Sequence, residues 1–145
     1  MTTGNSASWE LQKAIKTLLV GDATLATLLG GAVRFYDLVP EGAALPYIEY
    51  GEAGITAWDT DPADDRSGDG EEHTITIHIW SSYEGKKEVS LVQRRVRELL
   101  QNNTSLSLTG HILVNMRFLV SDTVRDPDGQ AFHGISQFRA VTEEN

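Results

Sequence analysis

Side chains alternate in kind between residues 73 and 81, HTITIHIWS, and this alternation limits the possible folds more than any other feature of the chain. Because successive side chains of a β-strand point to opposite sides, the three isoleucines share one apolar face. His78 and Trp80 share the opposite, more polar face with two threonines. The segment therefore predicts a strand whose apolar face is covered by another layer of the domain.

The rest of the chain shows helical and strand patterns in turn. Apolar residues recur at helical spacing in 7–20 and 84–101, and a short helix fits 23–29 between Asp22 and Gly30. A short strand follows Gly31, and further strand patterns fit 46–52, 111–121 and 131–143. This order predicts an α+β fold, a mainly antiparallel sheet of about five strands with two to three helices packed on it.

The segment HILVNMRFLVS, residues 111–121, has the most regular alternation of apolar and polar side chains. Its expected apolar face consists of Ile112, Val114, Met116, Phe118 and Val120. The following Asp126-Pro127-Asp128-Gly129 is a strong turn signal, so the last strand should return beside this one.

The 145 residues suit one domain, 1–145, with a loop at about 59–72 that we expect to be mobile because it is rich in Gly, Asp and Pro. No apolar run is long enough for a transmembrane helix, and the N-terminal residues lack the pattern of a secretory signal. The absence of cysteine excludes disulfides and thiolate chemistry.

Charge is distributed unevenly along a chain of net charge −9. That sign argues against a general nucleic-acid binder, which needs clustered Lys and Arg for phosphate contacts. The acidic loop holds Asp59, Asp61, Asp64, Asp65, Asp69, Glu71 and Glu72. A basic zone spans 86–97 and includes Arg94, Arg95 and Arg97. Separate zones of opposite charge allow contacts between copies or with a charged conduit, although solvated surfaces would look the same.

No constellation of residues predicts an enzyme, a metal site or a cofactor site. His73 and His78 are an odd number of residues apart, so a regular strand holds them on opposite faces. The acidic loop resembles a calcium loop until its last ligand position, where Thr76 replaces the required Glu. A nucleophile elbow around Ser136 fails because Phe138 stands where the second glycine is needed.

Trp80 is a more informative residue than any histidine. A large aromatic side chain on a polar strand face is typical of a protein contact. The alternative is a second layer, formed by the N-terminal helix with Trp9, that covers this face. We keep both interpretations at this point.

Several segments together resemble a known family over about Leu11 to Glu143. They are LQKAIKTLL, DATLATLLGG, RFYDLVPEGAALPYIEYGE, GDGEEHTITIHIWSS, RRVRELL, TGHILVNMRF and DPDGQAFHGISQFRA. In order and spacing these are similar to the tail-completion proteins of long-tailed bacteriophages, prophages and gene transfer agents. That group is similar in role to the tail terminators of siphophages. The acidic insert departs from the family pattern by its larger number of Asp residues.

The resemblance implies a non-enzymatic structural protein of the virion with no catalytic residue to carry over. Such proteins form a ring, usually of six subunits, that caps the tail tube, ends its polymerisation and joins the tail to the head-side connector or stopper. DNA passes through the lumen without sequence-specific binding. The expected location is the tail-neck region of the virion, with assembly in the cytoplasm of the bacterial host.

Two interaction hypotheses follow. In the first, some of Arg94, Arg95 and Arg97 face acidic residues of a neighbouring subunit, and His78 and Trp80 contact a subunit or another partner. In the second, the acidic loop faces the lumen or the tube end, where negative charge keeps DNA from adhering. The alternative functions are another neck protein, a head–tail adaptor or stopper, and a small cytosolic ligand-binding α+β domain.

Overall fold

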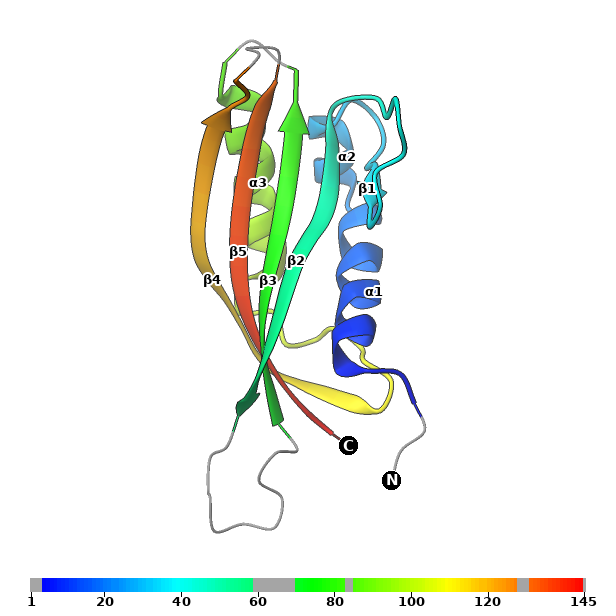
Figure 1. The fold of residues 1–145 in the computed structure, drawn as a ribbon. Helices are drawn as coiled ribbons and strands as arrows, with labels where there is room; N and C mark the ends of the chain where they lie inside the picture. Colours follow the sequence, from blue (N-terminus) through cyan, green and yellow to red (C-terminus); the bar gives the residue numbers. More distant parts are fainter. Residues whose placement is uncertain (1–3, 59–69, 83–84, 128–130, 145) are drawn as a thin grey trace.

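The predicted α+β architecture is confirmed by the computed structural model, which describes residues 4–58, 70–82, 85–127 and 131–144. Its elements are α1 (Ala7–Val20), α2 (Ala23–Leu28), β1 (Phe35–Tyr36), β2 (Tyr47–Trp58), β3 (Gly70–Ser81), α3 (Lys87–Leu100), β4 (His111–Arg125) and β5 (Phe132–Glu144). They form a five-stranded sheet of order β1-β2-β3-β5-β4, antiparallel except for the pairing of β1 with β2. The three helices lie on one side of this sheet (Figure 1).

Local sequence sets the ends of the first two helices. Ser6 accepts a hydrogen bond from the Trp9 N–H at 3.1 Å and caps α1, which ends at Gly21. Asp22 then caps α2 by accepting from the Leu25 N–H at 2.8 Å. The tight connection between α1 and α2 folds the shorter helix back toward α3.

The core lies between the helices and the isoleucine face of β3. Ile75, Ile77 and Ile79 are at most 1% exposed, as the alternation predicts. They belong to the same buried cluster as Leu11 and Ile15 of α1 and as three valines of α3, Val89, Val92 and Val96. Burial of such aliphatic side chains contributes about 1.5–3 kcal/mol each and is the main force that holds the layers together.

His73 lies on the buried side of β3, as its position in the alternation predicts. It is 2% exposed, and its Nε2 is 2.9 Å from the Thr142 hydroxyl of β5. Burial lowers the pKa of His73, so the ring stays neutral at physiological pH.

The predicted faces of residues 111–121 are wrong in part. Register shifts between Leu113 and Asn115 and between Phe118 and Val120 interrupt β4. Each bulge adds an unpaired residue and reverses the side to which later side chains point. Leu113 and Met116 are therefore buried, whereas the predicted core residues Ile112, Val114 and Val120 are 49%, 39% and 40% exposed.

Strands β2 and β3 extend further toward the acidic segment than the sequence patterns predict. β2 runs to Trp58, beyond its expected end at Glu52, and pairs with Gly70–Glu72 at the start of β3. Glu71 and Glu72 thus belong to the sheet, and the loop ends before Gly70. Asp59, Asp61, Asp64, Asp65 and Asp69 lie outside the described residues. Among the described helices, none is long and apolar enough to span a membrane.

Candidate interaction surface on the open sheet face

No described element covers the sheet face that carries Trp80. All three helices pack on the isoleucine side, so the opposite face is open in the described part of the chain (Figure 1). Trp9 projects from α1 and is 45% exposed, on the other side of the sheet from Trp80. This geometry removes the interpretation in which the N-terminal helix covers Trp80. A contact between Trp80 and a partner remains a prediction.

Three rings from two strands form a continuous stack on this face. The rings of Trp80 and His133 are 3.8 Å apart between centroids and 9° from parallel. His133 stacks in turn on His78, with centroids 4.8 Å apart, and the His78 Nδ1 is 2.6 Å from the His133 Nε2. We call this group the Trp80–His133–His78 stack. Cross-strand pairing produces it, because Trp80 lies opposite His133 in the β3–β5 register.

Two carboxylates of β2 hold the ends of the stack. The Trp80 Nε1–H donates to Glu49 at 3.2 Å, and the His78 Nε2 is 3.2 Å from Glu52. Gly51 makes room for this arrangement, since a Cβ at that position would lie 2.4 Å from the His78 ring. The register shift in β2 between Tyr50 and Ala53 places Glu52 within reach.

The electrostatics of the stack disfavour a charged His133. Burial lowers the pKa of His133, and the neighbouring His78 lowers it further, whereas Glu49, Asp126 and Glu52 act in the opposite direction. In the hydrogen bond between the rings one imidazole donates and the other accepts. Double protonation would break this hydrogen bond and place two like charges in contact.

The stack offers contact area and hydrogen bonds, and it has no nucleophile. Ser136 is on the buried face, where its hydroxyl is 2.8 Å from that of Ser121. In the described ranges, no group of three or more His, Asp or Glu side chains is arranged to hold a metal ion. The arrangement suits recognition of another macromolecule through the edges of the stacked rings and their acidic border.

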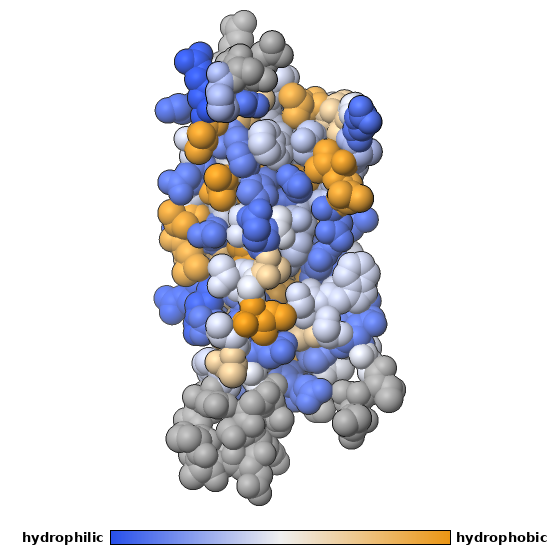
Figure 2. Space-filling view, viewed as in Figure 1, coloured by the Kyte–Doolittle hydropathy of each residue, from blue (hydrophilic) through white to orange (hydrophobic). Residues whose placement is uncertain are grey.

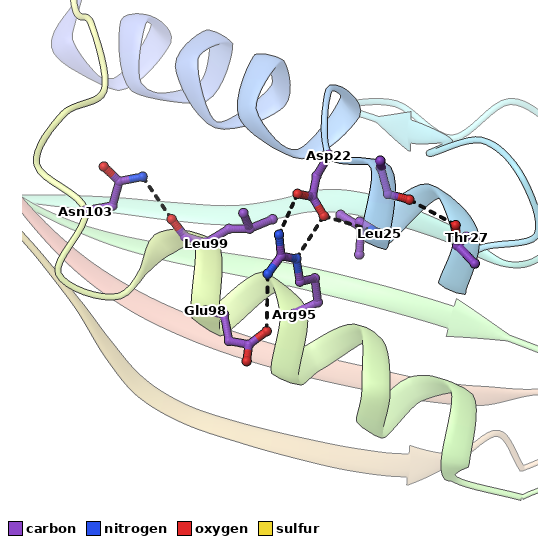
Figure 3. A network of polar contacts seen from close by, with 8 residues as sticks. Asp22, Leu25, Thr27, Arg95, Glu98, Leu99 and Asn103 are labelled. Atoms are coloured by element: carbon purple, nitrogen blue, oxygen red, sulfur yellow. Dashed lines mark hydrogen bonds and ion pairs between the residues drawn. The ribbon is translucent and has the colours of Figure 1, made fainter.

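The three arginines of α3 have different surroundings. Arg95 forms two hydrogen bonds with Asp22, at 2.7 and 2.9 Å, and lies 3.4 Å from Glu98 (Figure 3). Arg95 holds the pKa of Asp22 below its usual range. Arg97 lies 4.1 Å from the centre of the Phe118 ring and donates to Gln101. Arg94, with 76% of its side chain exposed and only a 3.6 Å approach to Glu98, is the arginine most available to a neighbour.

The acidic residues at the start of β3 are already engaged within the chain. Glu72 pairs with Arg139 of β5 at 2.9 Å, and Arg139 lowers the pKa of this carboxyl. Glu71 approaches His73 at 3.7 Å and is 39% exposed.

His133 is the residue of this surface that the sequence patterns did not connect with His78 and Trp80. The turn at residues 126–129 predicts only that β4 and β5 are neighbours. Insertion of β5 between β3 and β4 is a non-local event, and it brings His133 onto Trp80. An aromatic or imidazole side chain near the start of the last strand was the only local signal.

Comparison with known families identifies the family of the chain. A family model described as tail completion protein gp17 matches residues 13–143. The chain belongs to this tail-completion family. It is a structural protein of bacteriophage tail completion, as the order and spacing of its segments predict.

Two solved structures are similar to the chain. A chain from the virion of a native gene transfer agent particle is 25% identical with a TM-score of 0.81, and the match covers 97% of this chain and 99% of that chain. The gp17 protein of bacteriophage SPP1 is 22% identical with a TM-score of 0.58, and the match covers 100% and 96% of the two chains. The second likeness concerns the fold alone. Among curated protein sequences, none matches the chain significantly.

Proposed function

We propose that this tail-completion protein is a non-enzymatic tail terminator. Six or a similar number of copies form a ring that caps the tail tube, ends its polymerisation and joins the tail to the head-side connector. The observation that most supports this proposal is the match with a chain of a gene transfer agent virion, which covers 97% of this chain and 99% of that chain.

The proposed role is steric, and the open sheet face supports it. The Trp80–His133–His78 stack is preorganised by hydrogen bonds to Glu49 and Glu52, so little side-chain freedom is lost when a partner covers it. We propose that a neighbouring subunit or the tail tube protein contacts Trp80 and His78 there.

The basic helix supports a second contact, between subunits. Arg94 is the strongest candidate, because its partner within the chain is distant and both groups are well exposed. Arg95 and Arg97 orient α3 through Asp22 and Phe118, and they contribute to the positive surface around Arg94. Complementary charge at such a rim fixes orientation and speeds association more than it adds affinity.

The acidic loop is proposed to face the lumen or the tube end. Its Asp residues, together with Glu71 and Glu72 at the start of β3, would present negative charge to passing DNA and keep it from adhering. Replacement of Asp59, Asp61, Asp64, Asp65 and Asp69 by Asn removes this charge at constant chain length, so Trp58 and Gly70 can still pair in the sheet and the domain should still fold. The expected defect is in tail joining or DNA passage, and normal infectious titre would contradict the lumen role.

Tube capping is the experiment that tests the function. Purified protein is added to polymerising tail tube protein, and tube lengths and ends are recorded by negative-stain electron microscopy. The expected result is a ring on one end of each tube and arrested growth. Arg94→Glu should weaken ring formation on the tubes at low salt. Lys16→Glu is the matched control, because it reverses a positive charge at an exposed position of α1 and should leave ring formation unchanged. Binding to portal or connector but not to tube would favour a head–tail adaptor or stopper.

A further inference from the structure

Both side edges of the sheet are open over part of their length, and the open parts lie at opposite ends. β1 pairs with β2 only at Ile48 and Glu49. From Ala53 to Trp58, β2 pairs with β3 on one side and with no other described strand on the other. The side chains of residues 52–57 are exposed, including 48% of Ile55.

The β4 edge is covered at the end of the sheet where β2 is open, and it is open at the end where β1 covers β2. After α3 the chain returns along β4, and the Asn102 N–H donates to the Met116 carbonyl at 2.8 Å. Beyond that point no backbone hydrogen bond from the described residues covers the outer side of 117–125. Leu119 and Val124 are 49% and 48% exposed there, and apolar side chains are visible along this side of the molecule (Figure 2).

The open β2 segment lacks the usual protection of an edge strand, whereas the open β4 segment carries Arg117, Asp122 and Arg125 and a bulge between Phe118 and Val120. Natural edges are blocked by Lys, by Pro, by inward-pointing charge or by a very short strand. The β2 segment Ala53–Ala57, AGITA, contains no charge and no proline. Open edges of this kind accept another strand through main-chain hydrogen bonds.

We propose that the open β2 edge of one copy pairs with the open β4 edge of the next copy, so that the sheets of successive copies join head to tail. This inference rests on the proposed ring and specifies how its subunits meet. β2 and β5 run in one direction and β3 and β4 in the other. A neighbour's β2 beside β4 therefore continues the antiparallel alternation. Two different edges that meet in this way give a heterologous contact, which forms a ring when the rotation between successive copies closes and an open filament when it does not.

The offset of the two open segments agrees with ring closure. Within one copy, Thr56 of β2 lies at the level of Asn115 of β4, because Thr56 pairs with Glu72 of β3, Glu72 pairs with Val141 of β5, and Val141 pairs with Asn115. The bulge between Phe118 and Val120 adds no length, so pairing of Thr56 with Val120 or Asp122 of the next copy shifts the neighbour by four or six positions, ~13–20 Å at ~3.3 Å per residue. Four strands spaced by ~4.8 Å span ~19 Å, so the shift implies a strand tilt of about 35–45°. Closed barrels have tilts of roughly 35–45°.

Side-chain parity narrows the register to two choices. Thr56 lies on the same sheet face as His78, and so do Val120 and Asp122. Ser121 lies on the helix-bearing face, beside Ser136. Because directly opposed residues share a face, Thr56 is expected opposite Val120 or Asp122, and not opposite Ser121.

Cysteine cross-linking tests the pairing, because the natural chain has no cysteine. Single variants Thr56→Cys, Val120→Cys, Asp122→Cys and Ser121→Cys are prepared, and thermal unfolding confirms that each is folded. Thr56→Cys is mixed in equal amounts with each of the others, assembled on tail tubes and oxidised. Opposed strand residues are about 4.5–5.5 Å apart between Cα atoms, within disulfide range.

The expected result is a cross-linked dimer in the Val120 or Asp122 mixture, and none in the Ser121 mixture or in any single variant alone. Dimers of Thr56→Cys with itself would indicate two-fold β2–β2 pairing and overturn the proposal. Capped tubes without a cross-link in either mixture would also overturn it while leaving the proposed function intact. Tubes that the wild-type protein fails to cap would contradict the proposed function and the pairing built on it.

Discussion

Asp22 has two structural roles, and different substitutions can separate their contributions to the free energy of unfolding. It caps α2 through the Leu25 N–H and binds Arg95 of α3 with both carboxylate oxygens (Figure 3). The side chain of Asp22 is 13% exposed and that of Arg95 28%, so water partly screens the pair. Loss of an N-cap costs about 1 kcal/mol. A partly exposed ion pair contributes about 0.5 kcal/mol.

These magnitudes predict different losses for two substitutions at Asp22. Asp22→Ala removes both interactions and should lower the free energy of unfolding by about 1.5 kcal/mol. For a chain of this size that corresponds to a fall in Tm of about 5 °C. Asp22→Asn retains a capping side chain and loses only the charge, so its loss should be about 0.5 kcal/mol. Urea unfolding at pH 7, followed by circular dichroism, measures both.

The pH dependence gives an independent check. Arg95 lowers the pKa of Asp22 in the folded state. The contribution of the ion pair to the free energy of unfolding is therefore complete above the ordinary Asp pKa of about 3.9, and it is lost as the pH falls through the pKa of Asp22 in the folded state. The stability difference between wild type and Asp22→Asn should therefore shrink below pH 4.

A double-variant cycle can refute the reasoning. Asp22→Asn combined with Arg95→Gln should be no less stable than Arg95→Gln alone beyond experimental error, since Arg95→Gln already removes the ion pair with Asp22 as well as the contact with Glu98. Additive losses, or equal losses for Asp22→Ala and Asp22→Asn, would contradict the assignment of two separate roles to Asp22.

Three further predictions concern close packing and buried histidine. Gly134→Ala places a Cβ 2.5 Å from a methyl group of Val89, so α3 must shift, and the free energy of unfolding should fall by about 1–3 kcal/mol in urea titrations. Gly51→Ala collides with the His78 ring, which contributes to the lowered pKa of His133, so NMR titration should show a changed pKa of His133 with the core intact. His73 is buried with a lowered pKa, so stability should decline as the pH falls below about 6.5, and His73→Gln should reduce this decline in acid unfolding curves.

Each of these predictions has a control within the chain. Gly54→Ala meets no atom within 4 Å and should leave the histidine titrations unchanged. Val89→Ala should partly rescue Gly134→Ala, because it removes the methyl group that is struck. A pH profile of His73→Gln that is identical to that of wild type would show that His73 does not govern the decline.

Local sequence was sufficient to predict β3, the helices and the α+β class. The isoleucine alternation in β3 and the 3.6-residue period of α3 are local signals that tertiary packing did not override. The expected core of β4 was wrong at Ile112, Val114 and Val120, because nothing in the local pattern marks the two bulges.

The interaction surface was predictable only in part. Alternation placed His78 and Trp80 on the polar face, but the stack needs His133, which only the long-range pairing of β3 with β5 supplies. Charge runs identified the basic zone of α3, but they could not separate Arg95, which is bound to Asp22, from the exposed Arg94. Both failures concern contacts between residues far apart in sequence.

Tube length in the presence of the protein tests the central claim most directly. Tail tube protein is polymerised with increasing amounts of the purified protein, and tube lengths and end structures are recorded by electron microscopy. If the protein is a tail terminator, mean tube length falls as its concentration rises, and a ring occupies one end of each arrested tube. Unchanged tube lengths, with no ring at either end at saturating protein, would contradict the account.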